Sequence, residues 1–87
     1  MKTLNFTVTN EVGIHGRPAV MLVKLAKSFP RTTITVKKGD KTVEATHLMM
    51  LMGLGVVKND NIDFLINGGD EQAAYDALMD FSQKELS

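Results

Sequence analysis

The run Gly13-Ile14-His15-Gly16-Arg17-Pro18 combines the side chains in this sequence that are best suited to phosphate chemistry. His15 offers an imidazole, which is a nucleophile when its ring is neutral. Arg17 follows two residues later and offers a planar fork of donors that matches phosphate oxygens. Pro18 is favoured at a first helical position, so we expect the run to lead into a helix.

The start of a helix would suit a phosphoryl group carried on His15. The backbone N–H groups of a first helical turn lack intrahelical partners and carry the positive end of the helix dipole, so they bind anions. Gly16 lets the backbone approach closely, and the backbone of Gly16 and Arg17 would surround the phosphate. The same residues are also compatible with an ordinary loop, in which His15 is a solvated N-cap and Arg17 a surface charge. The residues alone leave both interpretations open.

A second candidate feature is an apolar surface around the segment Leu48-Met49-Met50-Leu51-Met52. Five apolar residues in a row on a short helix cannot all be buried, although Leu51 is expected to cover the sheet. Exposed, flexible methionines suit a surface that meets several differently shaped partners. Val20 lies off the buried stripe of the preceding helix and would extend this surface beside His15.

The remaining candidates have plainer interpretations. Lys24 and Lys27 are interpreted as solvated charges whose recognition role would be a local complement to an acidic partner. His15 and His47, without cysteine or a clear carboxylate spacing, do not make a convincing metal site. We therefore expect neither a metal nor a cofactor, and we interpret His47 as a surface residue.

The elements that position these residues follow from hydrophobic periodicity. Strict alternation predicts a strand over residues 2–9, and apolar residues at helical spacing predict a helix over 18–29, ended by Pro30. The further predictions are a hairpin around the turn 38–40 with strands over 33–37 and 42–45, a helix over 47–52 capped by Thr46, a strand over 62–67, and a helix over 71–84 capped by Asp70. This βαββαβα order predicts an α+β fold with one sheet covered by three helices on one face.

Length and composition narrow the class of protein. The 87 residues show no internal change of composition, so residues 1–87 are expected to form a single domain. Ten basic residues balance ten acidic ones, which gives no bulk attraction to nucleic acid or an anionic membrane. No cysteine, leader or long apolar run is present, so we expect a cytoplasmic protein without membrane insertion.

Over essentially its whole length the sequence resembles the histidine phosphocarrier (HPr) family of the bacterial phosphoenolpyruvate-dependent sugar phosphotransferase system. The resemblance rests on GIHGRPAV at 13–20, KTVEA at 41–45, the Leu- and Met-rich helix that ends in Gly53-Leu54-Gly55, and the closing strand and helix. It implies an open-faced β-sandwich with a four-stranded antiparallel sheet and three helices.

The resemblance also implies a function. Nδ1 of His15 would take phosphate from phosphorylated enzyme I and pass it to an enzyme IIA, with Arg17 stabilising the phosphate. Such a protein is a phosphoryl-transfer intermediate rather than a stand-alone enzyme, and we expect a monomer. The positions that would face both partners are Gly16, Val20, Leu48, Met49 and Met52, with Lys24 and Lys27 beside them.

Two positions depart from the family pattern. Gly16 stands where alanine is commoner in the family, a milder change that would loosen the active-site turn. In Gram-positive members a serine opens the second helix and is phosphorylated by a kinase, whereas this sequence has His47 there, preceded by Thr46. Serine control is therefore not expected. Two alternatives to a carrier remain: a regulatory paralogue that binds partners without carrying phosphate, and a generic binding module with a histidine at an anion site. The intact pair of His15 and Arg17 favours the carrier.

Overall fold

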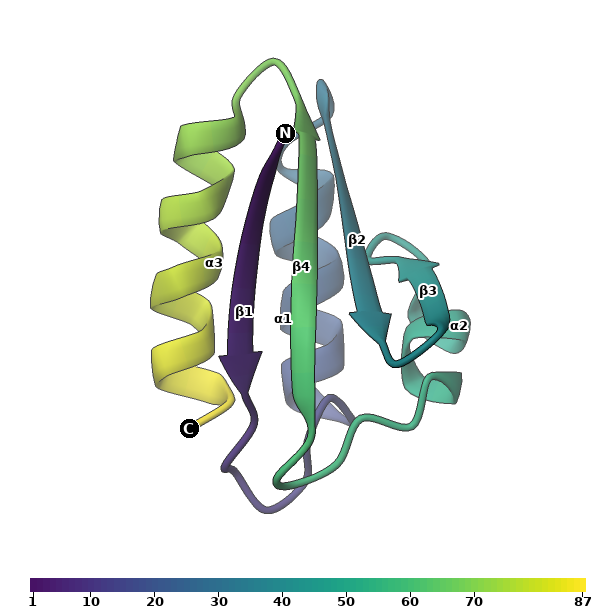
Figure 1. Ribbon diagram of the computed structural model, residues 1–87. Coiled ribbons are helices and arrows are strands. Elements are labelled where there is room, and N and C mark those ends of the chain that lie inside the picture. The colour runs from purple at the N-terminus through teal and green to yellow at the C-terminus, as the bar shows by residue number, and fades with distance from the viewer.

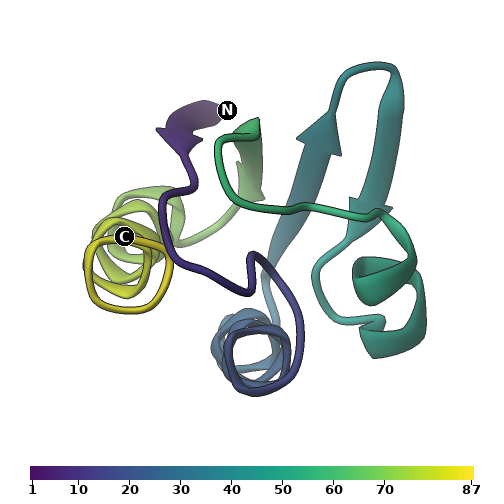
Figure 2. The same ribbon diagram turned by 90° about the horizontal axis from the view of Figure 1, so that it is seen from below.

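The computed structural model describes all 87 residues and contains one four-stranded antiparallel sheet with three helices on one of its faces (Figures 1 and 2). The strands lie in the order β1-β4-β2-β3. In chain order the elements are β1 (Lys2–Thr7), α1 (Arg17–Lys27), β2 (Thr32–Lys38), β3 (Lys41–Glu44), α2 (Leu48–Gly53), β4 (Asn61–Gly68) and α3 (Glu71–Glu85). The predicted α+β fold and element order are confirmed.

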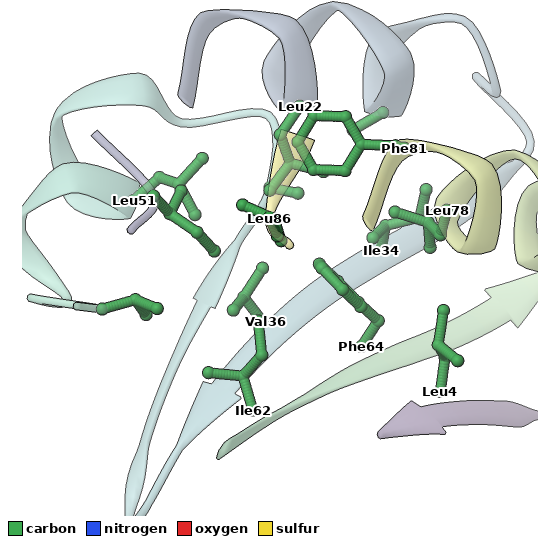
Figure 3. Close-up of a cluster of buried hydrophobic side chains, with 14 of the residues drawn as sticks. Leu4, Leu22, Ile34, Val36, Leu51, Ile62, Phe64, Leu78, Phe81 and Leu86 are labelled. Carbon is green, nitrogen blue, oxygen red and sulfur yellow. The ribbon is translucent and has the colours of Figure 1, made fainter. Parts of the chain in front are cut away.

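The core lies between the sheet and the helices, because alternate residues of each strand point toward the helical layer. Phe64 and Ile66 of the central strand β4 are fully buried, and Val36 of β2 lies directly opposite Phe64. Figure 3 shows Phe64 and Val36 beneath side chains from all three helices. The main helical contributors are Leu22, Leu51, Leu78, Phe81 and the C-terminal Leu86.

The opposite face of the sheet is polar, as the alternation predicts. The Asn5 amide donates to the side-chain oxygens of Asn61 at 2.7 Å and Asp63 at 2.8 Å on the neighbouring strand. The Asn61 amide in turn donates to Asn5 and Thr7. Polar side chains on this face therefore form hydrogen bonds with one another across β1 and β4. The helices cover only the opposite face.

The α1 helix begins and ends earlier than the periodicity predicts. The expected range was 18–29, whereas the helix ends at Lys27 with Ser28 as its C-cap. Phe29 precedes Pro30, and the residue before a proline disfavours helical backbone. The helix therefore ends at Lys27, three residues before Pro30, rather than at Phe29.

The start of α2 corrects a second prediction. Thr46 is not the N-cap, because the helix begins at Leu48 and His47 occupies the N-cap position with extended backbone and no side-chain cap bond. The His47 N–H donates to the Glu44 carbonyl, so the turn that follows β3 delays the helix by one residue. Asp70 is the N-cap of α3 as predicted, although its side chain makes no cap bond. The carboxylate of Glu71 instead accepts from the Gly68 N–H at 3.0 Å.

Candidate functional site

His15 lies in the segment between β1 and α1, residues 8–16, which we call the His15 loop. The loop lies at the end of the sheet where the C-terminus also lies (Figure 1). Gly13 and Gly16 flank the histidine with φ angles of 66° and 58°, in the left-handed region that favours glycine. Ile14 between them is buried and anchors the loop in the core, whereas His15 is exposed. The buried Ile14 therefore holds the loop backbone in place, while the side chain of His15 faces solvent.

The first support of the His15 loop is the segment 55–60, which leads from α2 to β4. The two segments run next to each other in Figure 2, and the Ile14 N–H donates to the Val56 carbonyl at 3.2 Å. Gly13 lies directly against the same carbonyl: a Cβ atom added there would be 2.1 Å from the Val56 oxygen. Both the close approach and the positive φ therefore require glycine at this position.

The second support is the side chain of Asn10, which binds the loop to the C-terminal end of the chain. Its amide oxygen accepts from the Gly13 N–H at 3.0 Å, and its amide nitrogen donates to the Glu85 carbonyl at 2.7 Å. The Thr9 N–H also donates to the Leu86 carbonyl at 2.8 Å. Sequence reasoning missed Asn10, although an asparagine three residues before a glycine is a signal for a side-chain-stabilised turn.

The first turn of α1 is arranged to receive an anion. Gly16 is the N-cap and has no side chain to bond to the first-turn N–H groups, while Pro18 occupies the first turn and no acidic residue lies there. Orphan N–H groups and the helix dipole therefore make this end of the helix locally positive. His15 lies directly before Gly16, the N-cap of this helix.

Arg17 is exposed and has its guanidinium available. Its Nε–H donates to the sulfur of Met21 at 3.4 Å, one turn along the helix, and the side chain makes no ion pair. No hydrogen bond joins Arg17 to His15. The outer N–H groups of the guanidinium are thus free to turn toward a phosphate on the neighbouring histidine.

The predicted docking residues lie on α1 and α2, which pack side by side at this end of the molecule (Figure 2). Met49 is 78% exposed, and Val20, Lys24 and Lys27 are also exposed. Leu48 and Met52 are half-buried and pack against the core. The exposed apolar side chains of the predicted surface are therefore Met49, Met50 and Val20, and the last two are 55% and 40% exposed.

His47 does not join His15. Its Nε2 lies 3.5 Å from the carboxylate of Glu44, and both side chains are about half exposed. No group of three or more His, Cys, Asp or Glu side chains is close enough to hold a metal ion. None of the helices combines the length and the apolar composition needed to cross a membrane.

The geometry defines a class of protein: a small sheet-and-helix domain that presents an exposed histidine at an anion-binding helix start. A family model described as "PTS HPr component phosphorylation site" matches residues 2–84. A phosphocarrier protein HPr from Lysinibacillus sphaericus is 36% identical over 90% of this chain and 88% of its own length. The chain belongs to the HPr family.

Solved structures agree with this assignment. The crystal structure of HPr-C-His from Thermoanaerobacter tengcongensis superposes with a TM-score of 0.92 at 34% identity, covering 99% of this chain and 96% of that one. A structure of an HPr dimer from the same organism superposes with a TM-score of 0.76 at 33% identity, covering 100% and 99% of the two chains. The predicted open-faced sandwich is confirmed, and the family assignment makes the protein a phosphocarrier of the phosphotransferase system rather than a generic binding module.

Proposed function

We propose that His15 is the residue that carries the phosphoryl group, which it accepts from phosphorylated enzyme I and passes to an enzyme IIA. In the first step the lone pair of Nδ1 attacks phosphorus, a P–N bond forms on His15, and the donor keeps the electron pair of the bond that breaks. The second step reverses these roles toward the acceptor. The observation that carries the proposal is the exposed His15 next to a helix start whose N-cap, Gly16, has no side chain.

Arg17 and the backbone around Gly16 would hold the phosphate while the carrier moves between partners. The guanidinium makes no ion pair in the structure, so a phosphate would not have to displace a carboxylate. Arginine forms bidentate, charge-assisted bonds with phosphate oxygens. Hydrogen bonds of this kind favour the phosphorylated state without supplying any catalytic group, which leaves acid–base chemistry to the partners.

The docking surface we propose combines apolar and basic residues. Its apolar side chains differ in exposure: Val20 and Met49 are exposed, and Leu48 and Met52 are partly buried. Every charged side chain of α1 is basic, namely Arg17, Lys24 and Lys27. Enzyme I and enzyme IIA would therefore present acidic rims to this face. We expect the carrier to act as a monomer, and sedimentation of the chain alone separates this state from a dimer.

The deciding experiment follows labelled phosphate from phosphoenolpyruvate through enzyme I to this protein. Wild type should gain acid-labile, base-stable label, His15→Ala should gain none, and the other histidine variant, His47→Ala, should label like wild type. The assignment fails if wild type stays unlabelled while an authentic HPr is labelled beside it. It also fails if the label survives in His15→Ala.

We also propose that the start of α2 is not under kinase control. His47 occupies the N-cap, and Thr46 lies one residue before that cap. Incubation with an HPr kinase and ATP should leave the protein unlabelled at this position, while a serine-bearing HPr is labelled in the same reaction. Stoichiometric phosphate on Thr46 would contradict this prediction.

A further inference from the structure

Lys38, at the end of β2, holds the segment 55–60 in place. Its ammonium donates to the Gly55 carbonyl at 2.6 Å and pairs with the Asp60 carboxylate at 2.9 Å. The same oxygen of Asp60 accepts from the Val57 N–H at 2.8 Å. One lysine and one aspartate thus join both ends of the segment and close it into a turn.

The enclosed turn carries the carbonyl on which the His15 loop rests. Val56 lies between Gly55 and Val57, and its oxygen accepts from the Ile14 N–H and packs against Gly13. A shift of the turn would therefore move the residue immediately before His15. Gly13 and the Val56 carbonyl are in close contact, since there is no room between them for even a methyl group.

Two residues of the turn have left-handed backbone. Asn59 is the only non-glycine residue with a positive φ, 78°, and Gly55 has a φ of 74°. Asparagine and glycine are residue types that adopt this conformation, so the sequence suits the turn. The Asn59 N–H donates to the Val8 carbonyl at 2.7 Å, and the Val8 N–H donates to the Asp60 carbonyl at 2.8 Å, so the turn is also bonded to the far end of the His15 loop.

We propose that Lys38 and Asp60 are positioning residues for phosphoryl transfer at His15. The proposal rests on the function proposed above for His15. The pair acts through Val56 on the location of the imidazole, without touching either the phosphate or the partner. A small misplacement of a reacting atom lowers the rate of transfer much more than it lowers binding.

A neighbouring ion pair offers a comparison. Lys58 and Glu11 join the segment 55–60 to the His15 loop at 3.0 Å, whereas Lys38 and Asp60 join it to β2. The side chains of Lys58 and Glu11 are 47% and 84% exposed, against 33% and 25% for Lys38 and Asp60. Exposed pairs contribute little. Lys58 also makes no bond to the backbone of the turn, whereas Lys38 binds the Gly55 carbonyl directly.

The test measures kcat and KM for phosphoryl acceptance from phosphorylated enzyme I, at a temperature where every variant is folded by circular dichroism. Lys38→Met and Asp60→Ala should each lower kcat about tenfold, with KM within about twofold of wild type. Lys38→Arg keeps the charge and a donor to Gly55 and should retain most of the activity. The matched controls Lys58→Met and Lys84→Met, which break ion pairs of similar length, should match wild type.

A second readout does not depend on phosphoryl transfer. Hydrogen exchange at the Ile14 N–H should be faster in Lys38→Met than in wild type, and unchanged in Lys84→Met. If wild type accepts no phosphate, the proposed function fails and this exchange rate still tests the positioning. Wild-type kcat in Lys38→Met, an equal loss in the control variants, or an unchanged Ile14 exchange rate would each overturn the proposal.

Discussion

At the scale of single residues, the tightest constraint near the proposed phosphorylation site is Gly13 rather than His15. Replacing Gly13 by alanine would place a Cβ atom 2.1 Å from a backbone oxygen that is itself bonded to Ile14. Because the positive φ adds its own strain, we expect Gly13→Ala to lower the free energy of unfolding by at least about 2 kcal/mol. Urea denaturation measures this change. A loss below about 0.5 kcal/mol would show that the loop can shift away from Val56 at little cost.

Gly16 differs, because a Cβ atom added there meets nothing within 4 Å. Gly39 in the β2–β3 turn has the same open surroundings and a φ of 59°, which makes it a matched control. Gly16→Ala and Gly39→Ala should each cost about 1 kcal/mol of stability from backbone strain alone. Phosphoryl acceptance should stay near the wild-type rate in both variants, because a methyl group at Gly16 meets nothing and leaves the first-turn N–H groups of α1 open. Slower acceptance in Gly16→Ala but not in Gly39→Ala would show that the site needs glycine beside His15.

The sequence at this scale indicates the residues proposed to carry the chemistry, but not those that hold the His15 loop in place. His15 and Arg17 are recognisable because imidazole and guanidinium before a proline suggest a phosphate site. Asn10, Lys38 and Asp60 act by bonding to backbone atoms that lie far away along the chain. No local pattern encodes such contacts, so they emerge only when the segments are placed in space.

At the scale of elements, α2 depends on a single fully buried side chain. Leu51 is the only buried residue of this helix, and Leu48 and Met52 cover it only in part. Leu51→Ala should lower the free energy of unfolding by about 2–5 kcal/mol, because it leaves a cavity under a short helix. The control Met50→Ala, at an exposed position of α2, should change it by less than about 0.5 kcal/mol. Thermal or urea unfolding distinguishes the two, and equal losses would mean that α2 is held by contacts other than Leu51.

Elements with a clear period were predictable, and their boundaries were less so. Alternation located β1, β2 and β4, because each of these strands buries one face only. The strand β3 has no buried residue and was predicted instead from the turn at 38–40. The predicted first strand over 2–9 ends at Thr7, since Val8 and Thr9 donate instead to Asp60 and Leu86. The predicted N-cap of α2 was Thr46, whereas the observed one is His47. The reason is similar, because a backbone hydrogen bond of the preceding turn determines where the helix begins.

At the scale of the whole molecule, two carboxylates make stability depend on pH. The Lys38 ammonium and the Val57 N–H hold the pKa of Asp60 below its usual range. The Gly68 N–H, followed by the N-terminal ammonium, lowers the pKa of Glu71 in the same way. A carboxyl whose pKa is lower in the folded state stabilises the protein above its unfolded pKa, and this stabilisation is lost as the pH falls through the folded value.

We therefore expect the free energy of unfolding to be flat with respect to these two groups near neutral pH and to decline below about pH 4. Urea denaturation between pH 6 and pH 3 measures the decline. Asp60→Asn should make the decline shallower, because only the Glu71 contribution then remains. An equally steep decline in Asp60→Asn would contradict the assignment of this pKa shift to the folded state.

The contact between Asn10 and the end of α3 has a consequence for the order in which the protein folds. Residues 85 and 86 supply the carbonyls that receive Thr9 and Asn10, and the Asn10–Glu85 contact joins residues 75 positions apart in the chain. Contacts between residues so distant in sequence form more slowly than local ones such as those of the β2–β3 hairpin. We therefore expect the His15 loop to reach its final conformation late in folding, after α3 has packed against the sheet.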